Sequence, residues 1–206
     1  MNMVQEKSFQ VMKDLSGYFK DGERERIYNS AESLRDKVLI RLLWVTGRRI
    51  TEVLNVKVSD IDFDLSKIKF HIEKKKIDVV KLKPIDKFTM DLLQFYIKQY
   101  NLHPINYLFN SDFKIDSPIT RQRAFQIIRK SCFKAGIYKV GDKEPHPHHF
   151  RHSFAIDMAK KMKTPADVRK LQLLLDHSTL GVTEQYLQFS DEEVSELVED
   201  LYERKD

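Results

Sequence analysis

Arginines and histidines that lie far apart in this sequence could together hold a phosphate group. His148 lies three residues before Arg151, so on a helix or a tight turn the two side chains share a face and can reach the same anion. Arg49 adds a second guanidinium, a group that is always charged and whose planar fork pairs with phosphate oxygens. Residues 146–152 contain four histidines, which also suggests zinc. The arginine and phenylalanine among them favour phosphate, and no cysteine or carboxylate lies nearby at ligand spacing.

Four short segments, in this order along the chain, resemble the motifs of the tyrosine recombinase, or phage integrase, family. Residues 46–54 (TGRRITEVL) resemble the first arginine box of that family, and residues 147–152 (PHHFRH) resemble its second box, whose core is His-x-x-Arg. Residues 176–178 (DHS) resemble the third element, with an aspartate where the family commonly has glycine. Tyr186 follows His177 by nine residues, which is the family's spacing between this histidine and its nucleophile. The resemblance covers most of the chain.

The resemblance implies an enzyme that cleaves and rejoins DNA through a 3′-phosphotyrosyl bond, without a metal, a cofactor or ATP. Such a reaction spreads negative charge over the non-bridging phosphate oxygens, so the site needs fixed donors aimed at them. Tyr186 would be the nucleophile, and a hairpin lysine would protonate the leaving oxygen, with Lys74 as first candidate and Lys75 and Lys76 as alternatives. The residues implied to hold the phosphate are Arg49, His148, Arg151 and His177, supported by Glu52 and His152.

Double-stranded DNA is the expected partner. Residues 114–177 contain fourteen Lys and Arg against six Asp and Glu, which is consistent with one DNA-facing surface. Within this region Thr120 begins a predicted helix, where backbone N–H groups and basic side chains can bind phosphate. The residues expected to contact DNA are Arg48, Lys75, Lys76, Thr120, Arg121, Arg123 and His149.

The hydrophobic pattern predicts a mainly helical fold with one small antiparallel sheet, an α+β class that agrees with the catalytic domain of the family. Apolar residues at helical spacing predict a buried helix over residues 30–45, which Gly47 ends, and a short helical turn at residues 50–54. Alternating residues predict a hairpin over residues 67–82. Further helices are predicted over residues 86–100, 120–135, 149–162, 165–175, 183–189 and 191–204.

Charge is distributed unevenly along the chain. Residues 190–206 hold eight acids and two bases, a net charge of −6, so the remainder of this chain of formal charge +5 carries +11. A body this basic suits a polyanion. The acidic helix expected at residues 190–206 has an apolar stripe, which would pack on its own domain or, as the family implies, dock in trans onto a neighbour in a homo-tetramer on DNA.

The length of the chain suggests one domain. Only 48 residues precede Arg49, too few for the helical core-binding domain that usually comes first in this family. We therefore expect residues 1–206 to be a single catalytic domain, either a minimal recombinase or a fragment. No apolar run reaches the roughly 18 residues of a membrane span, and the N-terminus does not resemble a secretory signal. We expect a cytoplasmic or nucleoid-associated protein.

Two other functions share these features. A type IB topoisomerase-like enzyme would use the same chemistry to relax supercoils within one duplex. A regulator could keep the fold and bind DNA without turnover. Strand exchange is favoured over the regulator, because a dead site has no physical reason to keep two arginines and two histidines around a tyrosine.

Overall fold

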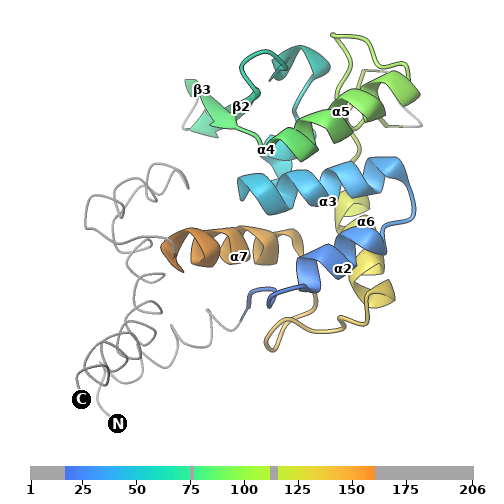
Figure 1. The fold of residues 1–206 in the computed structure, drawn as a ribbon, viewed down its shortest axis with the longest axis vertical. Helices are drawn as coiled ribbons and strands as arrows, with labels where there is room; N and C mark the ends of the chain where they lie inside the picture. The colour runs from blue at the N-terminus through green and yellow to red at the C-terminus, as the bar shows by residue number, and fades with distance from the viewer. Residues whose placement is uncertain (1–16, 75–76, 112–115, 161–206) are drawn as a thin grey trace, which may run out of the picture.

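The computed structural model describes residues 17–74, 77–111 and 116–160. The prediction of a mainly helical fold with a small antiparallel sheet is confirmed. Among the described residues, no helix is both long and apolar enough to cross a membrane. The elements are α2 (Glu23–Asn29), α3 (Leu34–Thr46), α4 (Ile50–Leu54), the 3-10 turn η1 (Val58–Asp60), β1 (Ile61–Asp62), β2 (Lys67–Lys74), β3 (Ile77–Pro84), α5 (Lys87–Gln99), α6 (Arg121–Lys134) and α7 (Pro147–Lys160), as Figure 1 shows.

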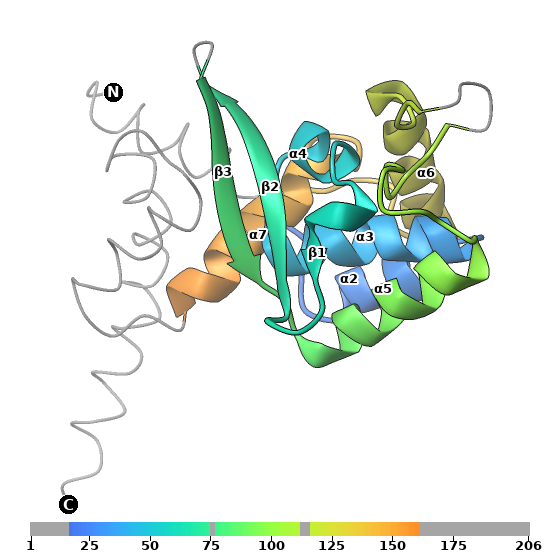
Figure 2. The same ribbon diagram turned by 90° about the horizontal axis from the view of Figure 1, so that it is seen from above.

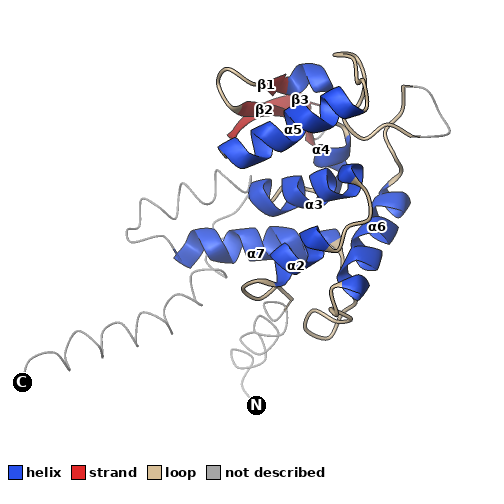
Figure 3. Ribbon diagram, turned by 45° about the vertical axis from the view of Figure 1, so that its right-hand side comes forward, coloured by secondary structure: helices blue, strands red, loops and turns tan. Residues whose placement is uncertain are grey.

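Helix α3 is the centre of the fold. The hydroxyl of Ser33 caps its start by accepting a hydrogen bond from the N–H of Asp36 at 3.1 Å. Val38, Leu39, Ile40 and Leu42 are all buried, although they point to different sides of the helix. A helix that is apolar on several sides needs covering on several sides. Accordingly, α5 and the sheet lie on one side of α3, while α7 and α2 lie on the other (Figure 3).

The sheet is antiparallel in the order β1-β2-β3, and Figure 2 shows the three strands side by side. The pairing of β2 with β3 runs from Lys67 opposite Pro84 to Lys74 opposite Ile77, so the predicted hairpin is confirmed. Along β2, the side chains of Ile68, Phe70 and Ile72 are buried, and the residues between them are exposed. Three elements were missed: α2 has seven residues, η1 has three and β1 has two, which is too few to show a period.

Helix α5 forms where it was expected, but its buried face is only partly the expected one. Of the residues whose spacing predicted the helix, Tyr96 is buried and Leu92 packs against the core, whereas Phe88 and Phe95 are 55% and 58% exposed. The rest of the buried face is formed by Thr89, Met90 and Leu93. The hydroxyl of Thr89 donates to Asp86 at 2.7 Å and accepts from Nε of Arg41 at 2.8 Å. This polar link to α3 fixes the rotation of α5 about its axis.

Gly47 brings α7 against the end of α3. Its φ of 58° is left-handed, and its N–H donates to the carbonyl of Leu43 at 3.2 Å, so it ends α3 as the sequence predicts. A Cβ atom at this position would lie 2.4 Å from the ring of Phe154 and 3.0 Å from its Cβ. Glycine is therefore required twice, once for the backbone angle and once for the close approach of α7.

We predict that Gly47→Ala lowers the free energy of unfolding by roughly 3 kcal/mol or more, because left-handed strain and overpacking add. Gly136→Ala is the matched control, since Gly136 also has a positive φ, 76°, but a Cβ there meets nothing within 4 Å. The control should lose only about 1 kcal/mol. Urea unfolding measures both. Equal losses would show that the contact with Phe154 contributes nothing.

Candidate active site

Arg49 lies at the junction of α3 and α4. The left-handed turn at Gly47 redirects the chain, and Arg49 then takes an extended conformation as the residue before α4. Its side chain is 43% exposed, and its Nη1 donates to Glu52 at 3.0 Å. Glu52 is buried and also lies 3.4 Å from the N–H of Arg49. This carboxylate therefore orients a guanidinium whose outer edge remains accessible.

Arg48 points the other way, and its predicted DNA contact is wrong. The side chain is 1% exposed, with its guanidinium 5.4 Å from the ring centre of Phe70 and 3.4 Å from Glu52. A group this enclosed cannot reach a phosphate outside the fold. Glu52 thus joins two neighbouring arginines, one facing inward and one facing outward.

The second arginine motif, residues 147–152, packs against the first, residues 46–54. Nη1 of Arg151, on α7, donates to the carbonyl oxygen of Gly47 at 2.9 Å, across 104 residues of sequence. His148 lies one turn before Arg151 on the same helix and is exposed. Its pKa is lowered, first by partial burial and then by the positive charges of Arg151, Arg49 and Arg121. The charges of the three arginines therefore act on that of His148.

Three helices begin at this cluster. Arg49 immediately precedes α4, Arg121 is the first residue of α6, and His148 is the second residue of α7. The N-terminus of a helix carries a partial positive charge and unpaired N–H groups, so each helix adds to the attraction for an anion. The hydroxyl of Thr120 caps α6 by accepting a hydrogen bond from the N–H of Arg123 at 3.1 Å. The basic side chains at this end of the helix are exposed. The arrangement suits one phosphate group held from several sides.

His149 is not a DNA contact either. The residue is 2% exposed, and its ring stacks on His146 at 3.7 Å and meets the edge of Phe19 at 5.9 Å. Burial lowers its pKa to about 3, with smaller contributions from neighbouring charged groups. The prediction failed because the sequence does not show which side of α7 faces the core. His149 points to the side opposite Arg151, two residues further on. His152 is half-buried, with its ring centre 6.4 Å from that of His148, where it can support that residue.

Several predicted site residues cannot be placed. Lys75, Lys76, His177 and Tyr186 lie outside the described residues, as do the helices predicted after residue 162. Lys74 ends β2, where its backbone pairs with Ile77. No group of three or more His, Cys, Asp or Glu side chains that could hold a metal ion occurs within the described ranges.

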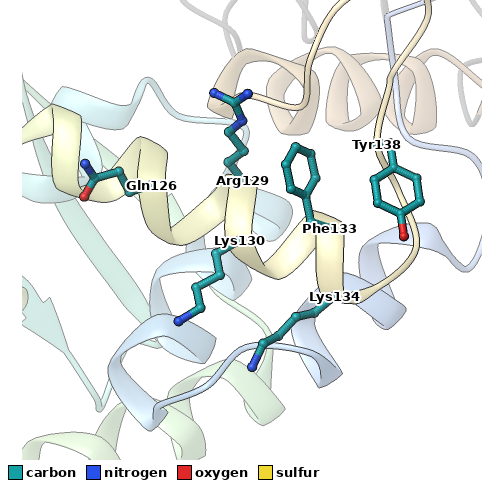
Figure 4. A pocket seen from close by; sticks show the side chains of 6 residues that line it. All are labelled: Gln126, Arg129, Lys130, Phe133, Lys134 and Tyr138. Carbon is teal, nitrogen blue, oxygen red and sulfur yellow. The ribbon is translucent and has the colours of Figure 1, made fainter.

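A surface hollow on α6 does not belong to this cluster. It is lined by Gln126, Arg129, Lys130, Phe133, Lys134 and Tyr138, from the middle of α6 to the loop that follows it (Figure 4). Its basic side chains already have acidic partners: Lys130 and Lys134 pair with Glu32, and Arg129 pairs with Glu144. The hollow is therefore less suited to an anion than the opposite end of the helix.

The sequence pattern of the phage integrase family matches residues 18–193, so this chain belongs to that family. It is 33% identical to a tyrosine recombinase of Pseudothermotoga lettingae over 84% of its length, and 30% identical to tyrosine recombinase XerC of Staphylococcus epidermidis over 88%. The matched regions make up 56% and 60% of those two proteins, so the chain spans little more than half the length of these relatives.

Solved structures share the fold. The crystal structure of XerA recombinase superposes with a TM-score of 0.71 at 25% identity, covering 89% of this chain and 62% of XerA. XerH recombinase, crystallised with its difH substrate after cleavage, gives a TM-score of 0.72 at 23% identity, covering 89% of this chain and 53% of XerH. The tyrosine recombinase catalytic-domain fold is therefore confirmed.

We predict that removing the two adjacent arginines changes the free energy of unfolding by different amounts. Arg48→Met should lower the free energy of unfolding by about 3 kcal/mol, because it breaks a buried ion pair. Arg49→Met should change it by less than about 1 kcal/mol, since that pair is solvent-exposed at one end. Urea unfolding of both variants measures the difference. An Arg49 variant as unstable as the Arg48 variant would contradict the outward role of Arg49.

The pKa of His148 tests whether α6 reaches the cluster. Arg121→Gln should raise this pKa, because one of the positive charges that lowers it is removed. Arg123→Gln is the matched control, since Arg123 is not among the charges that act on His148. The histidine ring signals are followed by NMR across pH, with His148→Asn used for assignment. An unchanged pKa in the Arg121 variant would place α6 away from the site.

Proposed function

We propose that this chain is the DNA-cleaving and rejoining part of a site-specific recombinase. One observation carries the proposal: Arg151 donates to the carbonyl of Gly47, two residues before Arg49, so two arginine segments that are far apart in the sequence meet. The charges of Arg49, Arg151 and Arg121 also lower the pKa of His148. Family membership supports the same conclusion. The substrate is a phosphodiester of double-stranded DNA, and the reaction is transfer of the phosphate to a tyrosine and then to the 5′-hydroxyl of another strand.

The charges of the cluster match what the transferred phosphate needs. In transit between two oxygens, its non-bridging oxygens carry the growing negative charge. Arg49 and Arg151 can clamp these oxygens from two sides, because Glu52 holds one guanidinium and the carbonyl of Gly47 holds the other. Donors fixed before the reaction need no reorganisation during it, which is the main source of rate enhancement in such sites.

Tyr186 is the proposed nucleophile, with His177 as a further phosphate donor and Lys74 as the acid. The spacing of nine residues between His177 and Tyr186 supports the first two assignments. The position of Lys74 at the end of β2 supports the third, with Lys75 and Lys76 as alternatives. A tyrosine has a pKa near 10, so the surrounding positive charge must favour loss of its proton. The phosphotyrosyl ester keeps the energy of the broken bond, so neither ATP nor a metal is needed.

The working assembly is proposed to be a homo-tetramer on DNA, in the cytoplasm or at the nucleoid. A lambda integrase tetramer on a Holliday junction shares this fold, with a TM-score of 0.61 at 17% identity over 82% of this chain. The acidic segment at residues 190–206 would dock on a neighbouring protomer or, alternatively, pack on its own domain. Its net charge of −6 suits contact with the other residues of either chain, which carry +11.

A covalent adduct tests the proposed nucleophile. Duplexes with a fixed nick and randomised flanking sequence are incubated with the protein, and adducts that survive denaturation are isolated and sequenced. We expect adducts from the unaltered chain and none from Tyr186→Phe, because only the phenol oxygen can form the ester. Tyr138→Phe is the control and should retain the adduct, since Tyr138 is an exposed tyrosine outside the cluster.

The outcomes separate the alternatives. An undiminished adduct in Tyr186→Phe would refute the assignment of the nucleophile. Binding of DNA without any adduct would indicate a regulator. Efficient relaxation of a supercoiled plasmid that lacks the selected sequence would indicate a type IB topoisomerase-like enzyme instead of a recombinase.

A further inference from the structure

The start of α7 is capped by two histidines. His146 immediately precedes Pro147, the first helical residue, where proline is favoured. The N–H of His148 donates to Nδ1 of His146 at 3.2 Å, and the N–H of His146 donates to Nδ1 of His149 at 3.2 Å. This is the reciprocal pattern of a capping box, with imidazoles in place of the usual Ser or Thr and Glu or Gln.

The cap works only when both rings are neutral. In each ring Nδ1 accepts a backbone hydrogen bond, and a proton on Nδ1 would place two donors face to face. The stacked rings lie 3.7 Å apart, so two imidazolium charges would also repel each other. Burial lowers the pKa of both groups, to about 3 for His149, which keeps the pair neutral.

The surroundings of the pair also favour its neutral form. Lys143, from the loop before α7, and His148 lower the pKa of both rings, and His152 lowers that of His149. From the segment before α2, the group that packs on His149 is the apolar ring of Phe19. Within the part of the chain that the structure describes, no acidic group is among the charges that act on either ring.

The capped turn carries the phosphate-binding residues. His148 lies between the two capping histidines, and Arg151 follows the second by two residues. Ser153 fixes the next turn, donating to the carbonyl of His149 and accepting from the N–H of Phe19, both at 2.8 Å. If the cap opened, the first turn of α7 would lose the contacts that aim His148 and, through the helix, Arg151.

We propose that His146 and His149 are positioning residues, a neutral imidazole pair that holds His148 and Arg151 in place and makes strand cleavage depend on the pair remaining unprotonated. The inference rests on the proposed function. The two rings act through their neighbours and do not themselves touch the phosphate.

The rate of adduct formation, measured in a single turnover from pH 5 to 8 on the DNA selected above, tests this role. His146→Ala should lower the rate by roughly five- to tenfold at neutral pH, the factor by which losing a cap typically shifts the equilibrium of a helix end, without weakening DNA binding to a similar extent. His146→Ser supplies a cap that does not titrate, so the rate should recover. Its decline at acid pH should also move to lower pH than in the unaltered chain.

Two further variants complete the experiment. His146→Ser with His149→Gln rebuilds a standard capping box, and the single His146→Ser variant suffices if the buried substitution prevents folding. His103→Ser is the control, since His103 is exposed and lies outside α7, and its pH profile should match that of the unaltered chain.

The possible failures are distinguishable. A pH profile of His146→Ser that superposes on that of the unaltered chain would overturn the positioning role alone. Long-range ¹H–¹⁵N NMR of the protein without DNA at pH 7 shows which ring nitrogen carries the proton. A proton on Nδ1 of His146 or His149 would also overturn the positioning role. Absence of adduct from the unaltered chain would instead overturn the proposed function, and this inference with it.

Discussion

Positive charges held close enough to act on one another are the constraint on which this structure depends. Like charges near a protein surface repel, because the effective dielectric constant there is well below that of water. The fold offsets this repulsion locally: Glu52 binds Arg49, the carbonyl of Gly47 binds Arg151, and His148 gives up its proton more readily than a free histidine. The remaining deficit of negative charge is what a phosphodiester would supply.

Packing around α3 keeps the members of the cluster in place. Arg49 follows directly from the end of this helix, and Arg151 belongs to the helix that packs on Gly47. Helix α6 contacts both α3 and α4, so the start that bears Arg121 is joined to the same unit. Each charged side chain therefore lies on, or next to, a packed helix. The buried apolar residues of α3 hold these helices together and so keep the charged side chains near one another.

Much of this could be predicted from the sequence, and the failures share a cause. The period of apolar residues predicted α3, α5 and the hairpin, because period is a local property. Which of two adjacent residues faces inward depends on the turn before them, so Arg48 was mistaken for a DNA contact although its side chain is buried and that of its neighbour Arg49 is the exposed one. His149 failed in the same way, and the buried face of α5 depends on a polar link to Arg41.

Protonation is expected to have opposite effects at His148 and at the capping pair, His146 and His149. A phosphate placed among the arginines would raise the pKa of His148, since its negative charge favours imidazolium, so binding would be helped by moderate acidity. The cap formed by His146 and His149 requires neutral rings and is weakened by the same acidity. The fold separates the two requirements by exposure: the ring of His148, which we propose meets the substrate, is exposed, while His149, one residue later, is buried against Phe19. A single helical turn can therefore hold an exposed ring that takes up a proton and a supporting pair of rings that resists protonation.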